Sequence, residues 1–258
     1  MKKTASKYLF EFIVIVLGIS VSFAIDEWDQ NRKNKIQHIK DLQSLRNDLV
    51  NDSLMFASVQ FQLDRGKKKV NELLNEIELY QARKLDYNEF TKRIINIAFP
   101  YDNKTFFMTD ATFKSLISSN RIDLFPDNIH SLINDYYESI RKRINDNNHM
   151  IDDNAIKYYH DYHPFALYYV NSLVDLGFTE FKARELEINQ IDKRLLPRFK
   201  KYFSYDGIKN IYTSHTFLQF TSSLKNRIHK YNNQISIYKK KRDVIAKEIN
   251  IRIVEINR

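Results

Sequence analysis

Residues 42–80 read LQSLRNDLVNDSLMFASVQFQLDRGKKKVNELLNEIELY, and a mostly apolar residue returns at every seventh position. One line of this repeat consists of Leu42, Leu49, Phe56, Leu63, Val70 and Ile77. The second line, three positions further on, consists of Leu45, Asp52, Val59, Gly66, Leu73 and Tyr80. Asp52 and Gly66 interrupt the second line. Two apolar lines with this spacing are typical of a helix packed along another helix. The stretch therefore predicts one long helix over about residues 30–82.

A second heptad repeat occupies the last part of the chain. One line consists of Thr221, Ile228, Ile235, Arg242, Ile249 and Ile256, and the other of Phe217, Leu224, Tyr231, Tyr238, Ile245 and Arg252. The repeat predicts a second long helix over about residues 214–257. Two helices of similar length at the two ends of a domain favour an antiparallel pair.

The segment between the two long helices predicts shorter helices. Apolar residues recur there at helical spacing, and no alternating strand pattern with hairpin signals is present. Glycine and proline, which most turns need, number only four each. We therefore expect an all-α fold in which residues 26–258 form a single soluble domain, a coiled-coil-like antiparallel bundle.

Composition narrows the function classes. The chain has no cysteine, which excludes disulfides and thiolate metal sites. Its net charge is +9, from 41 Lys and Arg against 32 Asp and Glu. A positive charge of this kind can attract nucleic acid or anionic lipid. However, the bases are interspersed with acids, and the densest run, residues 239–242, is more typical of a solvated helix face. We do not expect nucleic acid as a partner.

An apolar segment lies near the start of the sequence. Residues 8–25 contain a single charged side chain, that of Glu11, and their 18 residues approach the length of about 20 that crosses a bilayer. Tyr8 and Trp28 bracket the segment, as interfacial aromatic anchors do. We expect a transmembrane helix over residues 8–25, in contact with membrane lipid and continuing into the first long helix. Residues 1–7 form a basic flank.

A cleaved signal peptide is the alternative for this segment. Residues 2–7 supply a basic region, and Ser22-Phe23-Ala24 resembles a cleavage site. The apolar run is long for a signal peptide, contains Glu11 and enters the next helix without a breaker, so we favour an uncleaved anchor. The bases that precede the span favour a cytoplasmic N-terminus, with residues 26–258 in the periplasm of a bacterial inner membrane.

One face of the expected span combines an acid with small residues. Glu11, Ile15, Gly18 and Ser22 form one helical stripe. Small residues allow close helix contact in lipid, so this stripe predicts a homo-oligomer seam. Alternatively, Glu11 lies at the headgroup level and the position of Gly18 is incidental. The residues favour neither reading.

The same residues carry a resemblance. Glu11, Gly18, residues 25–29 (Ile-Asp-Glu-Trp-Asp) and Arg32-Lys33 resemble the N-terminal signature of an uncharacterised family of single-span membrane proteins from Bacteroidota, a domain of unknown function. The chain departs from that signature at Phe10, where the family has Gly, and at three acids that replace amides. The resemblance implies an uncleaved anchor with a basic inner end, and it implies no activity.

A second pattern of that family is similar to residues 112–120, TFKSLISSN, followed by Tyr136-Tyr137. Asn120 stands where the family pattern has Gly. Both residue types tolerate a left-handed backbone, so a helix could end there in either case.

Catalytic patterns are weak. His160, Asp161 and His163 could place imidazole and carboxylate ligands on one helix face, as a metal-dependent hydrolase would need. We favour a polar helix end before Pro164 instead. The four glycines stand too far apart for a phosphate loop. We expect no cofactor and no enzyme activity.

The expected function is therefore that of a membrane-anchored helical scaffold, sensor or assembly protein. It would act through self-association and contact with a protein partner. The alternative is a channel-like or ion-responsive oligomer in which Glu11 faces a shared axis.

Overall fold

The computed structural model describes residues 2–97, 104–177 and 195–256, with the side chains of residues 2–10 and 170 outside this description. Every regular element in these ranges is helical, and no strand occurs in them. The prediction of an all-α fold is therefore confirmed.

The chain divides into two compact units. Unit 1 comprises Met1–Val50, Asp110–Ile133 and Val244–Arg258, and unit 2 comprises Asn51–Thr109 and Asn134–Asp243. The sequence patterns carry no signal for this division.

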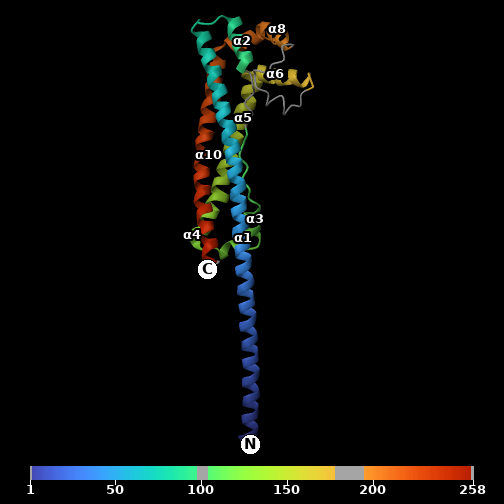
Figure 1. The fold of residues 1–258 in the computed structure, drawn as a ribbon, viewed down its shortest axis with the longest axis vertical. Helices are drawn as coiled ribbons and strands as arrows, with labels where there is room; N and C mark the ends of the chain where they lie inside the picture. Colours follow the sequence, from blue (N-terminus) through green and yellow to red (C-terminus); the bar gives the residue numbers. More distant parts are fainter. Residues whose placement is uncertain (1, 98–103, 178–194, 257–258) are drawn as a thin grey trace. The chain divides into compact units, whose positions relative to one another are not determined.

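The helices of the described chain follow in order. They are α1 (Lys2–Gln81), α2 (Tyr87–Ile97), α3 (Ala111–Ser118), the 3₁₀ turn η1 (Arg121–Leu124), α4 (Asp127–Asn134), the π-helical turn η2 (Asp135–Ile140), α5 (Arg141–Lys157), the π-helical turn η3 (Tyr158–Tyr162), α6 (Pro164–Val174), α8 (Leu196–Ser204), α9 (Asp206–Thr213) and α10 (His215–Ile256). Figure 1 shows α1 and α10 as the two longest elements.

The heptad positions of α1 are in the core. All six residues of its first line are buried, and so are Leu45, Val59 and Leu73 of the second line. Asp52 is buried as completely as the apolar residues around it. On α10, both lines are buried from Phe217 to Tyr238. Sequence periodicity therefore identified the packed faces of both long helices.

Within unit 2, α1 and α10 run in opposite directions. The Gln60 side-chain amide donates a hydrogen bond to Oδ1 of Asn232 at 2.7 Å. Nearer the end of α1, Tyr80 lines the same shallow hollow as Thr213, the last residue of α9, and His215, the first residue of α10. Residues further along α1 therefore lie beside residues nearer the start of α10. This is the expected antiparallel arrangement.

In unit 1, side chains of α1 hold the segment that contains α3 and η1. Oδ2 of Asp48 accepts a hydrogen bond from the backbone N–H of Thr112, in the first turn of α3, at 3.1 Å. After α3, Asn120 has φ of 54°, in the left-handed region. The expectation that the helix ends around an asparagine in this conformation is confirmed.

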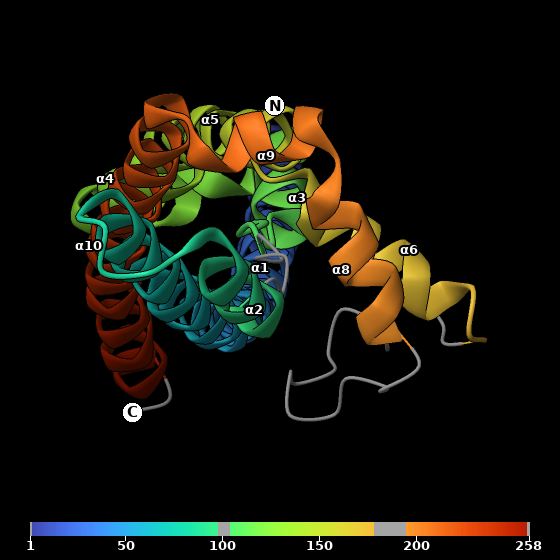
Figure 2. The ribbon, with the colours of Figure 1, turned by 90° about the horizontal axis from the view of Figure 1, so that it is seen from above.

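Aromatic side chains join α6, α8 and α9 in unit 2. The ring of Phe165 on α6 lies 5.2 Å from that of Phe199 and 4.6 Å from that of Phe203, both on α8. The ring of Phe203 lies 5.3 Å from that of Tyr212 on α9. Figure 2 shows α6 and α8 side by side, as these contacts require. The many aromatic residues of the chain are largely core material here.

The expected transmembrane helix lacks support in the described residues. In that part of the chain, no helix contains a stretch that is long and apolar enough to cross a membrane. Fourteen uncharged residues, 12–25, separate Glu11 from Asp26, which corresponds to about 21 Å of helix. The predicted span also includes residues 8–10, whose side chains lie outside the description.

Candidate functional site

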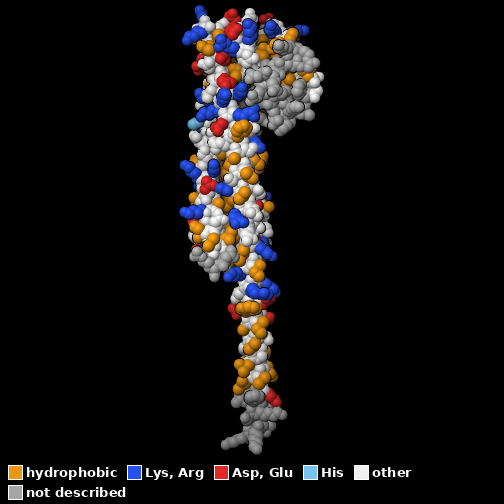
Figure 3. All heavy atoms as spheres, viewed as in Figure 1, with side chains coloured by type: hydrophobic (Ala, Val, Ile, Leu, Met, Phe, Trp, Pro, Cys, Tyr) orange, Lys and Arg blue, Asp and Glu red, His pale blue; other side chains and the backbone are white. Residues whose placement is uncertain are grey.

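The first described part of α1 exposes a continuous apolar surface. We call residues 12–25 the apolar band. Its large hydrophobic side chains are Phe12, Ile13, Val14, Ile15, Val16, Leu17, Ile19, Val21, Phe23 and Ile25, which are between 42% and 70% exposed. Because consecutive residues of a helix point about 100° apart, a run of exposed residues surrounds the helix on all sides. Figure 3 shows hydrophobic side chains along this part of α1.

Such a surface is costly in water. Complete burial of one Val, Leu, Ile or Phe side chain contributes about 1.5–3 kcal/mol. Ten side chains that are about half exposed therefore leave on the order of 10 kcal/mol of hydrophobic free energy available for contact with another apolar phase. A helix that is apolar on every side is typical of one enclosed by lipid or protein.

Three of the four residues of the predicted seam lie on this band, and Glu11 directly precedes it. Glu11, Ile15, Gly18 and Ser22 are all exposed. A Cβ built on Gly18 would meet no heavy atom within 4 Å. The Ser22 hydroxyl donates to the Gly18 carbonyl at 3.0 Å, so it is satisfied within its own helix. The single chain thus leaves this face accessible to a neighbour.

Charged residues follow the band. Trp28 is 66% exposed, and the Arg32 guanidinium lies 5.6 Å from its ring centroid. Asp29 forms ion pairs with Arg32 at 2.9 Å and with Lys33 at 2.7 Å. The predicted anchor at Tyr8 lies outside the described side chains. An exposed tryptophan beside bases is the chemistry of an interfacial anchor.

The structure does not assemble the metal candidate. Nδ1 of His160 lies 2.7 Å from Asp161 at an exposed position, and Lys157 also pairs with that aspartate at 3.3 Å. His163 is buried instead, and its Nδ1 lies 3.1 Å from the Tyr212 hydroxyl. Among the described residues, no three His, Cys, Asp or Glu side chains are grouped to hold a metal ion.

His163 is held in its neutral form. Burial lowers its pKa to about 3. The Phe165 backbone N–H donates to the Tyr212 hydroxyl oxygen at 3.0 Å, so the Tyr212 proton is available to Nδ1 of His163. In this arrangement Nδ1 is an acceptor, and the proton of the neutral ring resides on Nε2. His163 therefore organises the junction of η3, α6 and α9, a structural role.

Asp52, the interruption in the first heptad repeat, is a polar contact inside unit 2. Its Oδ1 accepts a hydrogen bond from the Thr109 backbone N–H at 2.7 Å, and its Oδ2 accepts one from the Tyr136 hydroxyl at 2.8 Å. Burial and this carboxylate raise the pKa of Tyr136 well above its ordinary value. Because two donors reach this buried carboxylate, its hydrogen-bonding needs are met.

The two π-helical turns place polar aromatic groups in the core. Tyr136 and Tyr137 in η2 are both fully buried although they are consecutive. In η3, the Tyr158 hydroxyl lies 2.8 Å from Oγ1 of Thr221 on α10. A π turn changes the angle between successive side chains, and such turns are frequent at functional sites. Sequence periodicity gave no signal for either turn.

Unit 1 contains a buried histidine beside an ion pair. His38 is 8% exposed, and neither ring nitrogen has a hydrogen-bond partner among the described residues. Its ring packs edge-on against Phe125 at 4.6 Å. Arg121 donates to the two carboxylate oxygens of Asp41 at 2.8 and 3.3 Å. Burial is the main cause that lowers the pKa of His38, and Arg252 adds to it while Asp41 opposes it.

Comparison with known proteins adds one result. The model of a family of unknown function, DUF6090, matches residues 11–161, more than half of the chain. No curated protein and no solved structure matches. The match bears out an uncharacterised family, and it covers the apolar band and η2. It does not bear on the lineage or on the spaced residues that suggested the resemblance.

Proposed function

The chain belongs to DUF6090, a family of unknown function, and we propose that it is a membrane-anchored helical protein that acts by binding other proteins and further copies of itself. The observation that carries this proposal is the apolar band. A surface with on the order of 10 kcal/mol of unburied hydrophobic free energy needs an apolar environment, and a bilayer surrounds a helix on all sides.

The length of the apolar stretch is the main constraint on this proposal. The fourteen residues of the band reach about 21 Å, short of a hydrocarbon core of about 30 Å. In the sequence, Tyr8, Leu9 and Phe10 extend the apolar stretch across Glu11 to 18 residues, about 27 Å. Local thinning of the bilayer and snorkelling of Glu11 accommodate the difference between this length and the thickness of the hydrocarbon core.

The interaction role follows from how α1 is used. One unbroken helix carries the apolar band and also contributes buried heptad residues to both units. The apolar band and the buried heptad residues of unit 1 therefore lie on the same helix, with no linker between them. A helical scaffold, sensor or assembly protein uses such a connection to present binding surfaces at the membrane.

Vesicle flotation tests the anchor. The full-length chain, reconstituted from mild detergent, is expected to float with vesicles of neutral phospholipid in high salt and to resist alkaline extraction. Val14→Lys/Leu17→Lys places two charges in the band and is expected to abolish flotation, since each costs about 2.5–3.5 kcal/mol in a bilayer. Leu54→Lys/Phe61→Lys alters equally exposed residues of α1 outside the band and serves as the matched control. Equal flotation of the two double variants would contradict anchoring by the band.

Intact-mass measurement separates an anchor from a signal peptide. The membrane-extracted protein is expected to retain residues 8–25. A mature chain that begins at Ile25 would instead identify residues 22–24 as a cleavage site and would refute the anchor. A reporter fused after Arg258 tests the proposed orientation, with activity expected on the periplasmic side.

Self-association is tested on the seam. Gly18→Leu fills the open face of the stripe, and we expect it to reduce cross-linked oligomers in detergent by severalfold. Ala24→Leu adds similar bulk about 120° around the same helix, outside the stripe, and is the control. If wild type is monomeric, or if only Ala24→Leu reduces cross-linking, this stripe is not the seam.

A further inference from the structure

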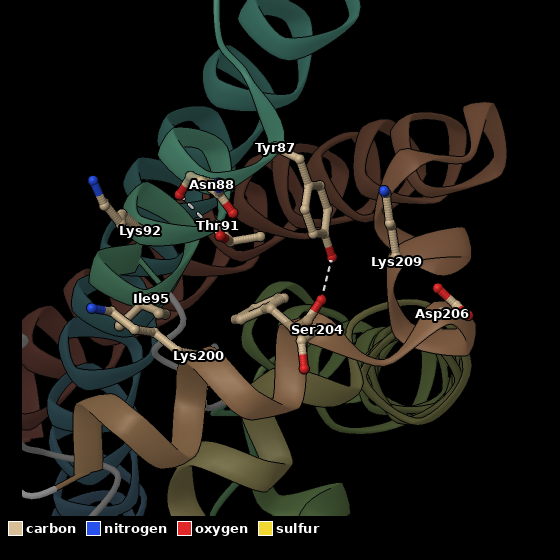
Figure 4. A pocket seen from close by; sticks show the side chains of 10 residues that line it. Tyr87, Asn88, Thr91, Lys92, Ile95, Lys200, Ser204, Asp206 and Lys209 are labelled. Carbon is tan, nitrogen blue, oxygen red and sulfur yellow. Dashed lines mark hydrogen bonds between the residues drawn. The ribbon is translucent and has the colours of Figure 1, made fainter.

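A pocket of unit 2 lies between α2, α8 and α9. Its volume is about 470 Å³, within the range of small-molecule sites. The floor includes Thr91, Ile95 and Phe203, which are buried. The Tyr87 hydroxyl donates to the Phe203 carbonyl at 2.9 Å and so joins α2 to α8. Figure 4 shows Tyr87 between Thr91 and Lys209.

Three of the side chains that line the pocket are lysines. Figure 4 shows Lys92 and Lys200 extending on one side and Lys209 on the other side, beyond Tyr87. The Lys209 ammonium lies 5.3 Å from the ring centroid of Tyr87, a cation–π distance. Among the described lining residues Asp206 is the only acidic one, so their charges sum to about +2.

Two of these lysines have no carboxylate partner in the described chain. Lys92 approaches Glu89 at 3.4 Å, but Lys200 and Lys209 form no ion pair among the described residues. Lysine ammonium groups are compact charges with three donors each and commonly bind phosphate. A pocket lined by such groups favours a ligand that carries negative charge.

We propose that this pocket binds a small phosphate-bearing anion, with Lys92, Lys200 and Lys209 as its charge partners. The apolar floor at Ile95 and Phe203 would receive the organic part of the ligand. The inference is independent of the anchor, because every residue it uses belongs to unit 2. The phosphate is that of a soluble metabolite or of a lipid headgroup, and the two sources share the same recognition chemistry.

Calorimetric titration of the full-length chain with inorganic pyrophosphate at low ionic strength tests the proposal. Lys200→Ala/Lys209→Ala is expected to weaken binding roughly two- to twenty-five-fold, since an exposed lysine contributes about 1.5- to fivefold. Lys67→Ala/Lys68→Ala removes two exposed positive charges from α1, outside the pocket, and is expected to change the affinity less than twofold. All the substituted lysines are exposed, so far-ultraviolet circular dichroism should remain that of wild type.

Two results would overturn the proposal. Equal weakening in the two double variants would show that pyrophosphate responds to the general charge of the protein. Absence of pyrophosphate binding at 10 mM would show that the pocket does not take phosphate. Pyrophosphate binding measured with and without nanodiscs that contain phosphatidylglycerol then shows whether the bound phosphate group belongs to a lipid headgroup or to a soluble ligand. Competition by phosphatidylglycerol that is lost in Lys200→Ala/Lys209→Ala indicates a headgroup, and pyrophosphate binding unchanged by the lipid indicates a soluble ligand.

Discussion

Acidification is expected to destabilise the chain through His163. Its folded-state pKa is about 3, below the ordinary value of 6.5, because the ring is buried. The unfolded chain therefore binds the proton first, and stability rises with pH between these two values. The contribution of neutral His163 to the free energy of unfolding is fully present above about pH 6.5, and it is lost progressively as pH falls towards 3.

The magnitude follows from these two values. Between pH 7 and pH 5 the unfolded histidine becomes almost completely protonated while the folded one stays neutral. The free energy of unfolding then falls by about 2 kcal/mol. Any folded pKa well below 5 gives nearly the same figure. Protonation would also remove the acceptor at Nδ1 that the Tyr212 hydroxyl uses, so the folded state has no favourable way to accept the charge.

Urea unfolding of the full-length chain in mild detergent, followed by circular dichroism at several pH values, measures this effect. His163→Gln keeps an acceptor for Tyr212 but does not titrate, and its unfolding free energy is expected to lose about 2 kcal/mol less than wild type between pH 7 and 5. His160→Gln changes an exposed histidine three residues away and is the matched control. Parallel pH dependence in wild type and His163→Gln, or equal flattening in His160→Gln, would refute the reasoning.

Three further outcomes follow from buried polar groups. Asp52→Leu restores an apolar heptad position but leaves the Tyr136 hydroxyl and the Thr109 N–H without their acceptor, so we expect a loss of about 2–4 kcal/mol in urea unfolding. A double-mutant cycle with Tyr136→Phe should give a coupling of about 1 kcal/mol, and additive losses would contradict the contact. Burial lowers the pKa of His38, so acidification through about pH 6.5 should decrease the amide protection factors around His38, after correction for the intrinsic exchange rate, and His38→Phe should remove that decrease. Arg121→Gln should cost about 1–3 kcal/mol because Asp41 stays buried with a weaker partner, and unchanged stability would show that water replaces the guanidinium.

Much of the helical architecture could be predicted from the sequence. Leu42, Phe56 and Ile77 are part of a seven-residue repeat, and α1 and α10 were recognisable because a helix packed along its length must repeat its apolar positions. The left-handed Asn120 was also predictable, since few residue types accept that backbone conformation.

The pocket and the buried polar contacts were not predictable in this way. Tyr87, Lys200 and Lys209 come from three helices, and their proximity depends on packing between segments distant in sequence. Asp52 looked like a defect in the repeat because its donors, Thr109 and Tyr136, are far along the chain. His163 was read as a possible metal ligand, but its burial against Tyr212 makes it part of the core.

Asp52 also bears on how the bundle selects one alignment. A heptad interface built only from aliphatic residues can slide by seven residues and still pack apolar side chains against apolar side chains. After such a slip, Asp52 would take the place now held by Leu45 or Val59 and would lose the Thr109 and Tyr136 donors. A buried carboxylate without partners costs several kcal/mol, so the misaligned bundles are penalised far more than the native one. A single acid in the heptad interface thereby distinguishes the native alignment from alignments that would be equally stable with aliphatic residues alone.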